Sequence, residues 1–351
     1  MEQGDAVTGA LLGCAVGDAL GLPYEALSRR RGIRLLGQPD HHRFVLGRGM
    51  VSDDTEHTCM VAQALCASPR DPDAFARQLA RRLCWWLLGL PAGIGSATLR
   101  ATLKLWLGFA PARSGVFSAG NGPAMRSPIL GATIDDIDLL RGYVRASTIL
   151  THSDPKAFLG AWAVALAAWC AKRGIDTPGA FFEMYRSAAG ADTSAEFDAL
   201  MAKVEKSLSE GNSTESFAEQ LGCGRGVTGY VYRTVPVVLH SWLSHPRDFR
   251  LSVGAVIRCG GDTDTTAAIV GAIVGAGLGR AGIPPEWLNR LWEWPRTVNW
   301  MTNLAEAAGT AAKTGLPVRA PGIIPFASLA RNALFLSVVL VHVARRMLPP
   351  Y

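Results

Sequence analysis

Pairs of cysteines in a C-x-x-C spacing are missing from this 351-residue sequence, although it holds seven Cys. Most of these Cys lie singly inside apolar stretches, and their number is odd. The sequence therefore excludes a C-x-x-C zinc or redox site, and we expect reduced thiols packed in the core of a cytoplasmic protein. The N-terminal segment MEQGDAVTG also lacks the Lys or Arg that precedes the apolar stretch of a secretory signal, so export by that route is not expected.

Runs of Lys and Arg interleaved with aromatic residues are also missing. The 35 basic and 29 acidic side chains leave a formal net charge of +6. Without such runs, we interpret the positive charge as a source of solubility and of attraction for an anionic substrate, and we expect no specific nucleic-acid binding. The 49% of hydrophobic residues excludes a disordered chain and allows a sizeable core.

Alternating apolar and polar residues, which are typical of strands, are almost absent, whereas apolar residues recur at spacings of three and four. This helical spacing is clear at residues 7–12, 60–65 and 159–166. Clusters of Pro and Gly interrupt it and predict loops at residues 37–49, 90–95, 110–128 and 222–226. The sequence therefore predicts an all-α protein, mostly one compact multi-helix body.

Two of the predicted helices carry glycines at every fourth position, namely Gly9, Gly13, Gly17 and Gly21 in the first and Gly271, Gly275 and Gly279 in the second. This spacing places each set on one side of its helix, where the missing side chains let another backbone approach closely. The alternatives are tight packing in the core and a helix contact inside a membrane. We favour the core, because the uncharged run of residues 265–279 is shorter than the ~20 residues that a bilayer requires.

The end of the chain differs from the rest. Residues 323–344 are apolar apart from Arg331, Asn332 and His342, and two Arg residues follow them. Arg331 and Asn332 leave an uninterrupted apolar stretch of about twelve residues, which is short for a membrane span. We therefore divide the chain into a catalytic domain of residues 1–315 and an apolar extension of residues 316–351. The extension is interpreted as a core helix, a dimer contact, a helix on a membrane surface or a membrane span, and the two membrane alternatives are not favoured.

Two short segments combine carboxylates with hydroxyls directly before an apolar helical stretch. They are Ser52-Asp53-Asp54-Thr55-Glu56 and Gly260-Gly261-Asp262-Thr263-Asp264-Thr265. Neighbouring carboxylates repel one another, and a divalent cation is one way to neutralise them. The alternative is that each segment only caps a helix, since Asp, Ser and Thr are favoured at N-caps. The presence of two such segments favours one shared site.

The side chains of these segments indicate which cation is expected. Carboxylate and hydroxyl oxygens suit Mg²⁺ or Mn²⁺, whereas zinc favours His or Cys ligands, which neither segment contains. The sequence has no G-x-S-x-G motif, and neither acidic segment includes a Cys. A nucleophilic Ser or Cys is therefore not part of the predicted chemistry.

Several motifs occur together in a recognisable order. They are residues 9–13 (GALLG), residues 17–21 (GDALG) with Glu25 just after, residues 52–55 (SDDT), residues 120–126 (GNGPAMR), Thr151-His152 and residues 261–265 (GDTDT). With these motifs, the sequence resembles the ADP-ribosylglycohydrolase family, which includes the enzyme that reactivates dinitrogenase reductase. The resemblance covers roughly residues 4–300. The paired acidic segments with the Gly-Asn-Gly loop between them are a specific combination.

The resemblance implies an all-α bundle with a binuclear site of two Mg²⁺ ions, or Mn²⁺ in some members, at the base of an ADP-ribose cleft. Family members usually have Thr at the position of Ser52, which keeps the hydroxyl. We expect Glu25, Asp53 and Asp54 to take part in catalysis, Glu25 by contacting substrate or assisting proton transfer, and we do not assign the general base. Matched by position, the implied metal ligands are Ser52, Asp53, Asp54, Asp262, Asp264 and Thr265.

The resemblance also implies where the substrate binds. Residues 115–122 match the diphosphate and ribose loop of the family, and small residues leave backbone N–H groups free to converge on phosphate oxygens. The implied substrate contacts are Ser118, Gly120, Asn121, Gly122 and His152. Thr151-His152 is expected to open a helix, with the imidazole either donating to substrate or holding a loop.

The function implied is hydrolysis of the glycosidic bond between ADP-ribose and an acceptor on a protein or a small molecule. Arginine, serine, a nucleic-acid end and a small molecule stay open as the acceptor. Three alternatives are a catalytically inactive ADP-ribose-binding or structural member, a hydrolase of another ribosyl or glycosyl substrate, and a membrane-anchored interaction protein that uses the C-terminal segment. The intact acidic residues favour the enzyme.

Overall fold

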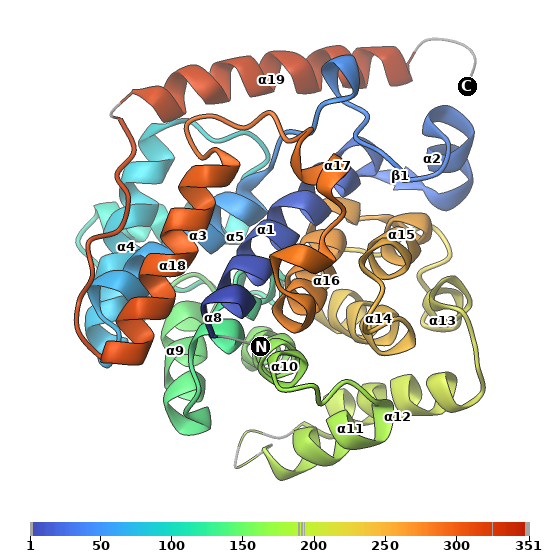
Figure 1. The fold of residues 1–351 in the computed structure, drawn as a ribbon, viewed down its shortest axis with the longest axis horizontal. Coiled ribbons are helices and arrows are strands. Elements are labelled where there is room, and N and C mark those ends of the chain that lie inside the picture. The colour runs from blue at the N-terminus through green and yellow to red at the C-terminus, as the bar shows by residue number, and fades with distance from the viewer. Residues whose placement is uncertain (1–2, 189, 191, 193, 325, 348–351) are drawn as a thin grey trace.

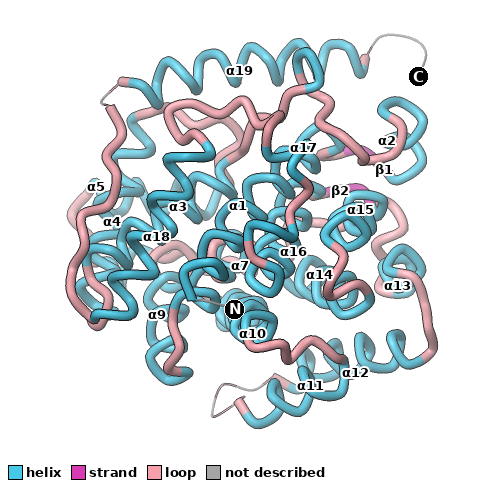
Figure 2. Tube along the Cα trace, viewed as in Figure 1, coloured by secondary structure: helices cyan, strands magenta, loops and turns pink. Residues whose placement is uncertain are grey.

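The structure, a computed structural model, describes residues 3–188, 190, 192, 194–324 and 326–347. It confirms the all-α prediction, since strands among these residues are limited to the two short segments β1 (Leu27–Ser28) and β2 (Gly260–Gly261) (Figures 1 and 2). The longer helices are α1 (Gln3–Gly21), α3 (Asp53–Ala67), α4 (Pro72–Leu88), α5 (Ser96–Trp106), α9 (Ile137–Ile149), α10 (Pro155–Lys172), α11 (Pro178–Ser187), α12 (Ala195–Ser209), α14 (Val231–Ser244), α15 (Phe249–Cys259), α16 (Thr263–Leu278), α18 (Val298–Thr314) and α19 (Ala327–Arg346).

Short helical segments connect these elements. They are α2 (Arg29–Leu36), α6 (Pro111–Ser114), α7 (Gly122–Met125), α8 (Pro128–Thr133), α13 (Thr214–Gln220), α17 (Pro285–Leu288) and the 3-10 turns η1 (Leu22–Tyr24), η2 (Val45–Gly47) and η3 (Arg280–Gly282). The helical spacing predicted at residues 7–12, 60–65 and 159–166 corresponds to α1, α3 and α10. Helices α1, α10 and α16 are almost entirely buried and form the centre of the molecule, with the other helices packed around them (Figure 1).

The two glycine ridges face each other along an antiparallel contact between α1 and α16. A Cβ atom added to Gly13 would overlap the carbonyl oxygen of Gly271, and one added to Gly271 would overlap that of Gly13. Gly9 and Gly275 are related in the same way. The two backbones therefore touch directly, which confirms the prediction that the ridges pack tightly in the core.

This contact brings two distant parts of the chain together. Because α1 and α16 are antiparallel, the end of α1 lies beside the beginning of α16, and Thr263 Oγ1 donates to the carbonyl oxygen of Gly21 (2.9 Å). The chain then continues from α1 into β1, which pairs with β2, and Ala26 N–H donates to Gly261 O (2.8 Å). The glycine packing therefore places Glu25 beside the second acidic segment.

The prediction of one loop over residues 110–128 is wrong. This stretch contains α6, α7 and the first residue of α8. Each of the three begins with a proline at its first or second position, namely Pro111, Pro123 and Pro128. Proline favours these positions because its missing N–H has no partner there in any helix and its fixed φ suits the first turn. Proline therefore marks helix starts in this stretch, and not a continuous loop.

The prediction that Thr151-His152 opens a helix is also wrong. Both residues lie in the turn between α9 and α10, where Val116 N–H donates to Thr151 O (3.0 Å). Helix α10 begins at Pro155 instead, and the side chain of its N-cap, Asp154, accepts from the backbone of the first turn. The turn is pinned to residues 115–117, which start the predicted substrate loop.

Helix α19 lies across the upper edge of the molecule as drawn in Figure 1. Phe335 and Val338 of this helix form a small apolar cluster with Leu22, Phe44 and Met50, separate from the main core. Most of the other apolar side chains of α19 are exposed. The helix is therefore attached to the body through a narrow inner face.

Candidate active site

The two acidic segments lie at the beginnings of α3 and α16. Ser52 is the N-cap residue of α3, and its Oγ accepts a hydrogen bond from Asp54 N–H (3.2 Å). Asp262 precedes α16, and Asp264 lies in the first turn. The unpaired N–H groups and the positive dipole end of a helix N-terminus stabilise carboxylates at both places. The capping interpretation is correct for Ser52, but the contacts between the segments go beyond capping.

The structure brings the two segments together at Asp54. Its Oδ2 accepts hydrogen bonds from Ser52 Oγ (3.0 Å) and from Thr265 Oγ1 (3.2 Å). Thr265 lies 211 positions after Asp54 in the sequence. Among the described residues, Oδ1 of Asp54 and Oδ1 of Asp264 are buried without a hydrogen-bond partner. A buried carboxylate oxygen with no donor destabilises a protein unless a proton or a cation compensates it. The buried carboxylates of this site therefore require a proton or a cation to compensate their charge.

The pKa values of the carboxylates lead to the same conclusion. Burial raises the pKa of Asp53, Asp54 and Asp264 well above the ordinary range of an aspartate, and nearby carboxylates raise it further. For Asp54 these neighbours include Asp18 and Asp262, and for Asp264 they include Asp262 and Asp54. The carboxylates therefore lie close enough to repel one another, and such a cluster retains protons unless another positive charge replaces them.

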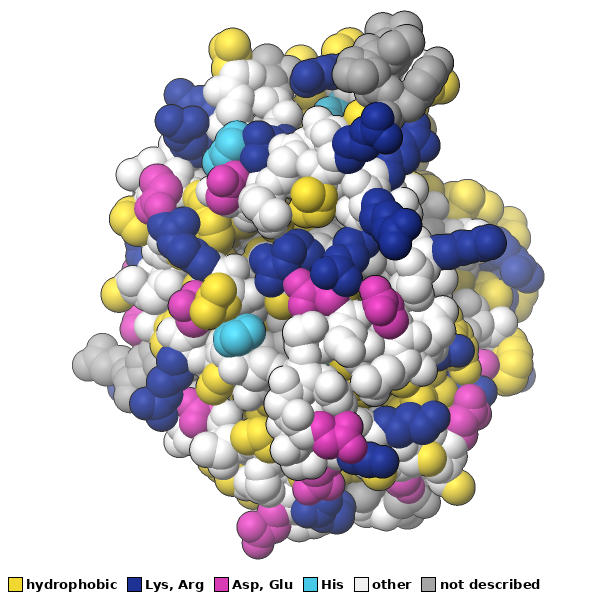
Figure 3. Space-filling model, turned by 90° about the vertical axis from the view of Figure 1, so that its right-hand side faces the viewer, with side chains coloured by type: hydrophobic (Ala, Val, Ile, Leu, Met, Phe, Trp, Pro, Cys, Tyr) yellow, Lys and Arg dark blue, Asp and Glu magenta, His cyan; other side chains and the backbone are white. Residues whose placement is uncertain are grey.

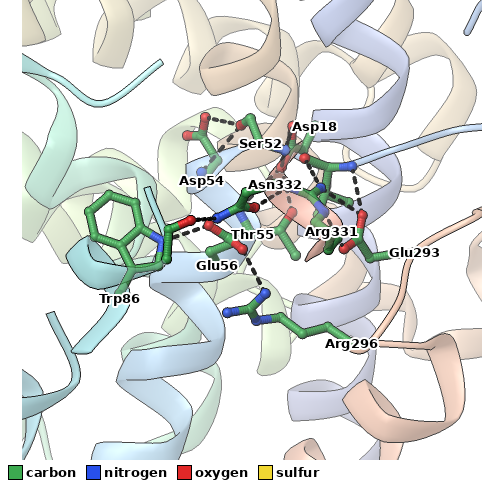
Figure 4. A network of polar contacts seen from close by, with 12 residues as sticks. Asp18, Ser52, Asp54, Thr55, Glu56, Trp86, Glu293, Arg296, Arg331 and Asn332 are labelled. Atoms are coloured by element: carbon green, nitrogen blue, oxygen red, sulfur yellow. Dashed lines mark hydrogen bonds and ion pairs between the residues drawn. The ribbon is translucent and has the colours of Figure 1, made fainter. Parts of the chain in front are cut away.

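Asp18 belongs to the GDALG motif of residues 17–21, but the sequence predicted no role for its side chain. Its oxygens accept from Ser52 N–H (3.0 and 2.9 Å), from Thr55 N–H (3.2 Å) and from Thr55 Oγ1 (2.5 Å), as Figure 4 shows. Burial raises the pKa of Asp18 to about 7, although these hydrogen bonds lower it. Asp18 therefore holds the first acidic segment from the centre of the fold. The sequence feature that could have identified Asp18 is a carboxylate inside an apolar helix that has glycines at every fourth position.

Glu25 and Asn121 border the second acidic segment. Glu25 is exposed at the edge of the site, yet the surrounding protein and the charge of Asp262 raise its pKa. Asn121 Nδ2 donates to Asp262 Oδ2 (2.7 Å) and to Thr234 Oγ1 (3.0 Å). The Gly-Asn-Gly loop is therefore attached to the carboxylates through its central residue.

His152 lies beneath the Gly-Asn-Gly loop and is only 4% exposed. A Cβ atom added to Gly120 would lie 2.9 Å from His152 Nε2, and one added to Gly122 would lie 3.1 Å from Cε1. Burial and the nearby Arg126 charge lower the pKa of His152 to about 3, so the imidazole is neutral. Ser118 Oγ accepts from Gly120 N–H (3.3 Å) within the loop. These contacts place the imidazole as the support on which the loop rests.

Glu56, the last residue of the first segment, has hydrogen-bond partners outside the acidic segments. Its two oxygens accept from Trp86 Nε1 and from Arg296 Nη1, each at 2.6 Å (Figure 4). Burial alone would raise the pKa of Glu56, but the charges of Arg296 and Arg331 outweigh it and lower the pKa. Glu56 is therefore an ionised, fully paired residue that fastens the first turn of α3 to the chain before α18.

Helix α19 supports the first segment from outside. Arg331 donates to both oxygens of Glu293 (2.8 Å each) and to the carbonyl oxygen of Val51, while Val51 N–H donates to Glu293 Oε2 (3.3 Å). All three groups are buried. Figure 4 shows Arg331 and Glu293 close to Ser52, the residue that follows Val51. The backbone that enters the acidic segment is therefore fixed on one side by Asp18 and on the other by an ion pair with α19.

In the described part of the chain, no group of three or more His, Cys, Asp or Glu side chains already has an arrangement that could hold a metal ion. The carboxylates of Asp18, Asp54 and Asp262 are instead engaged by neighbouring hydroxyl, amide and backbone donors. The unpaired oxygens of Asp54 and Asp264, together with the Ser52 and Thr265 hydroxyls, form a donor set made of hard oxygens. Hard oxygens of this kind are the ligands that Mg²⁺ and Mn²⁺ prefer.

Comparisons with known proteins identify the family of the chain. The ADP-ribosylglycohydrolase family model matches residues 1–316. The chain is 32% identical over 290 residues to an uncharacterized protein of Archaeoglobus fulgidus, which covers 80% of this chain and 90% of that protein. It is 28% identical over 323 residues to ADP-ribosylhydrolase ARH3 of Gallus gallus (80% and 87% covered). It is 27% identical over 297 residues to ADP-ribosyl-[dinitrogen reductase] glycohydrolase of Rhodospirillum rubrum (82% and 90% covered).

A solved structure, described as an ADP-ribosylglycohydrolase-related protein complex, is similar in fold. It has a TM-score of 0.62 and 24% identity, and the superposition covers 89% of this chain and 99% of that chain. Helix α19 begins beyond the residues that the family model matches. Because the family model matches nearly all of the chain before α19, this protein belongs to the ADP-ribosylglycohydrolase family.

Proposed function

We propose that this protein hydrolyses the glycosidic bond that links ADP-ribose to an acceptor, and that the reaction depends on divalent cations. The observation that carries the proposal is the contact between the two acidic segments at Asp54, with unpaired buried oxygens on Asp54 and Asp264. Membership of the family supports hydrolysis of ADP-ribose linkages on a protein or a small molecule. The intact carboxylates support an enzyme over a member that only binds ADP-ribose.

Two Mg²⁺ ions, or Mn²⁺, are the proposed cofactors. When bound, the cations supply positive charge that polarises substrate hydroxyls and water. Their arrival would neutralise the carboxylates whose pKa values burial and mutual repulsion raise. The proposed ligands are Ser52, Asp53, Asp54, Asp262, Asp264 and Thr265, and Asp18 orients Ser52 and Thr55 behind them.

The chain's own side chains have separate tasks in the proposed reaction. Cleavage at the anomeric carbon passes through an oxocarbenium-like state, which nearby carboxylates stabilise. Asp53 is partly exposed and Asp54 is buried behind it, so we assign orientation of the attacking water to this pair. Glu25 is exposed at the edge of the site and has a raised pKa, which suits contact with substrate and transfer of a proton.

The Gly-Asn-Gly loop is proposed to bind the diphosphate and the ribose. Ser118, Gly120, Asn121 and Gly122 are all partly exposed, as substrate contacts must be. His152 is buried and neutral beneath the glycines, so we assign it to support of the loop, one of the two roles that the sequence left open. Asn121 connects the loop to Asp262, and we infer that substrate binding and the acidic site are coupled through this hydrogen bond.

The test is hydrolysis of ADP-ribosylated arginine and serine peptides with Mg²⁺, with Mn²⁺ and with a chelator. We expect turnover of at least one substrate with cation, and we expect Asp264→Asn to lower kcat/KM by at least about 100-fold. The matched control is Asp138→Asn, which changes an exposed carboxylate in the first turn of α9 and should leave turnover unchanged.

Calorimetric titration of ADP-ribose separates the remaining outcomes. Binding that requires both Mg²⁺ and Asp264, without turnover of any peptide, would indicate an inactive ADP-ribose-binding member. Turnover that persists at the wild-type rate in Asp264→Asn with chelator would contradict the proposed cation site. Failure to bind ADP-ribose with or without cation would point to another ribosyl or glycosyl substrate.

A further inference from the structure

Helix α19 buries the polar residues Arg331 and Asn332 beside Phe335 and Val338, and it turns most of its other apolar side chains outward. Arg331 and Asn332 on its inner side are only 4% and 3% exposed. On its outer side, Leu336, Leu340 and Val341 are 46%, 58% and 70% exposed. A helix on the surface of a soluble protein normally has the opposite arrangement. The outer face of α19 therefore has the composition of a surface that meets an apolar environment.

The inner contacts show that this orientation is fixed. Asn332 Nδ2 donates to Gly89 O (2.8 Å), and Arg331 forms the buried ion pair with Glu293. Near the other end of the helix, His342 Nε2 contacts the carbonyl oxygen of Pro23 (3.0 Å). Rotation of α19 to hide its outer face would leave the buried Glu293 charge unpaired, which is strongly unfavourable. The exposed apolar face is therefore a consequence of specific contacts made by its inner residues.

The apolar surface continues beyond α19. The turn at Gly89 packs against Ser328 and Asn332, and its neighbours Leu88 and Leu90 are 52% and 71% exposed. Phe326, directly before the helix, is 84% exposed. Large exposed apolar patches of this kind mark sites of interaction. The beginning of α19 and the end of α4 thus form one apolar surface.

Basic residues border the other end of this surface. Helix α2 carries Arg29, Arg30, Arg31 and Arg34, all exposed, and Arg31 donates to the carbonyl oxygen of Arg346 at the end of α19 (3.0 Å). Figure 3 shows the side of the molecule that lies at the right in Figure 1, and Lys and Arg side chains gather across its upper half. Residues 327–346 and 84–95 contain no Asp or Glu. Arg29 pairs with Glu219 (3.3 Å), so the positive charge that accompanies the apolar surface comes from the other Arg residues of α2 and from Arg345.

We propose that α19 docks this protein on an anionic lipid bilayer. The helix would lie flat in the headgroup region, with its outer face in the apolar boundary and the Arg residues of α2 and Arg345 on lipid phosphates. A second copy of the chain would bring the same Arg residues to the contact, and α19 and the turn at Gly89 contain no carboxylate to pair with them, so charge complementarity favours anionic lipid. A span is excluded because Arg331 and Asn332 hold the inner face on the protein body.

Sedimentation of the full-length protein with phosphatidylcholine vesicles, with and without phosphatidylglycerol, tests the proposal. We expect binding to the anionic vesicles, and we expect Leu336→Glu with Leu340→Glu to weaken it by at least about tenfold. The matched control is Leu251→Glu on α15, a leucine that is 47% exposed in the wild type, which should bind as the wild type does. Thermal unfolding verifies that each variant is folded.

A second variant, Arg34→Gln with Arg345→Gln, tests the contribution of positive charge to vesicle binding. This variant should bind anionic vesicles about tenfold more weakly at low salt, with little further loss at high salt, because each Arg near an anionic surface contributes favourably. Two outcomes would overturn the proposal. One is no sedimentation of the wild type with anionic vesicles at low salt. The other is a concentration-dependent dimer that Leu340→Glu dissociates, which would assign the face to a second copy of the chain.

Discussion

Helices α1 and α19 have nearly the same hydropathy but opposite environments. The segment Asp5–Tyr24 has a mean hydropathy of 1.4 and is 100% buried, whereas Ala327–Arg346 has a mean hydropathy of 1.6 and is 22% buried. By length and composition either helix is able to cross a membrane. The difference shows that the overall apolar content of a helix does not decide where its apolar face lies.

The placement of a few residues decides it instead. In α1 the glycines at every fourth position let the backbone of α16 approach, so the whole circumference of the helix is enclosed. In α19 the polar residues Arg331, Asn332 and His342 bind to buried partners and leave the leucines outside. Variants of these residues are therefore the way to break or sharpen the comparison.

The largest effect is expected from Gly13→Leu in α1. The added side chain would overlap the carbonyl oxygen of Gly271, and neither backbone is able to move without separating the two helices. We expect a loss of at least about 4 kcal/mol in the free energy of unfolding, measured by urea denaturation. The control is Ala333→Leu on the exposed face of α19, expected to change that free energy by less than about 0.5 kcal/mol. Similar losses in both variants would contradict the proposed difference.

The second largest effect is expected from Arg331→Met in α19. The substitution leaves Glu293 buried without its cation, so we expect a loss of about 3 kcal/mol in the free energy of unfolding. The double variant with Glu293→Met should recover part of that loss, because no unpaired charge remains. A urea-denaturation cycle of the four proteins measures the coupling, and a value near zero would mean that the ion pair does not hold α19.

Much of the fold was predictable, and so was the meeting of the two acidic segments. The spacing of apolar residues predicted α1, α3 and α10, and the glycines at every fourth position predicted tight packing, because both patterns depend only on helix periodicity. That the ridges pack on each other, and thereby bring Glu25 to Asp262, did not follow from periodicity, because it depends on which helices pair.

The partners of individual site residues were not predictable for the same reason. Asp18 binds the backbone of Ser52 and Thr55, which lie more than thirty positions later along the chain. Glu56, two positions after the predicted ligand Asp54, has both carboxylate oxygens occupied by Trp86 and Arg296. A local sequence pattern identifies which side chains bear charge, whereas the distant partner decides which of them stays free for chemistry.

A third effect is expected from divalent cations. A cation bound at the proposed site, where α1 ends and α3 and α16 begin, would stabilise only the folded protein, by about 2.7 kcal/mol at a hundred times its Kd. Hydrogen exchange should therefore slow in α1 and α16 on addition of Mg²⁺ and return to its former rate with a chelator, while α19 changes little. Asp264→Asn should abolish the slowing. Equal protection of α19 and α1 by Mg²⁺ would mean that the two helices are not independent.

The smallest effect is expected from acidification. Burial lowers the pKa of His342, its hydrogen bond to Pro23 O opposes the shift, and the charges of Arg346 and Arg345 lower the pKa further. A histidine with a lowered pKa in the folded state contributes stability that is present above its ordinary pKa and is lost as the pH falls through it. Between about pH 8 and about pH 5, the protection of α19 amides should therefore decrease, and that of α1 should not.

The measurement is hydrogen exchange corrected for the intrinsic effect of pH on amide exchange. His342→Asn keeps a polar group near Pro23 O and cannot titrate, so its α19 amides should show the same protection at both pH values. A decrease of equal size in this variant would assign the pH response to another group.

The length of α19 has a consequence for the geometry beneath it. Arg331 contacts the backbone of Val51, and Arg346 donates to the backbone of Glu25 (2.9 Å), so the helix touches both the segment that enters the first acidic cluster and the segment that carries Glu25. The two arginines are fifteen residues apart, which at ~1.5 Å per residue is a separation of about 22 Å along a rigid rod. Helix α19 therefore fixes the distance between these two segments, and a tilt of the helix would change how far Glu25 lies from the first acidic segment.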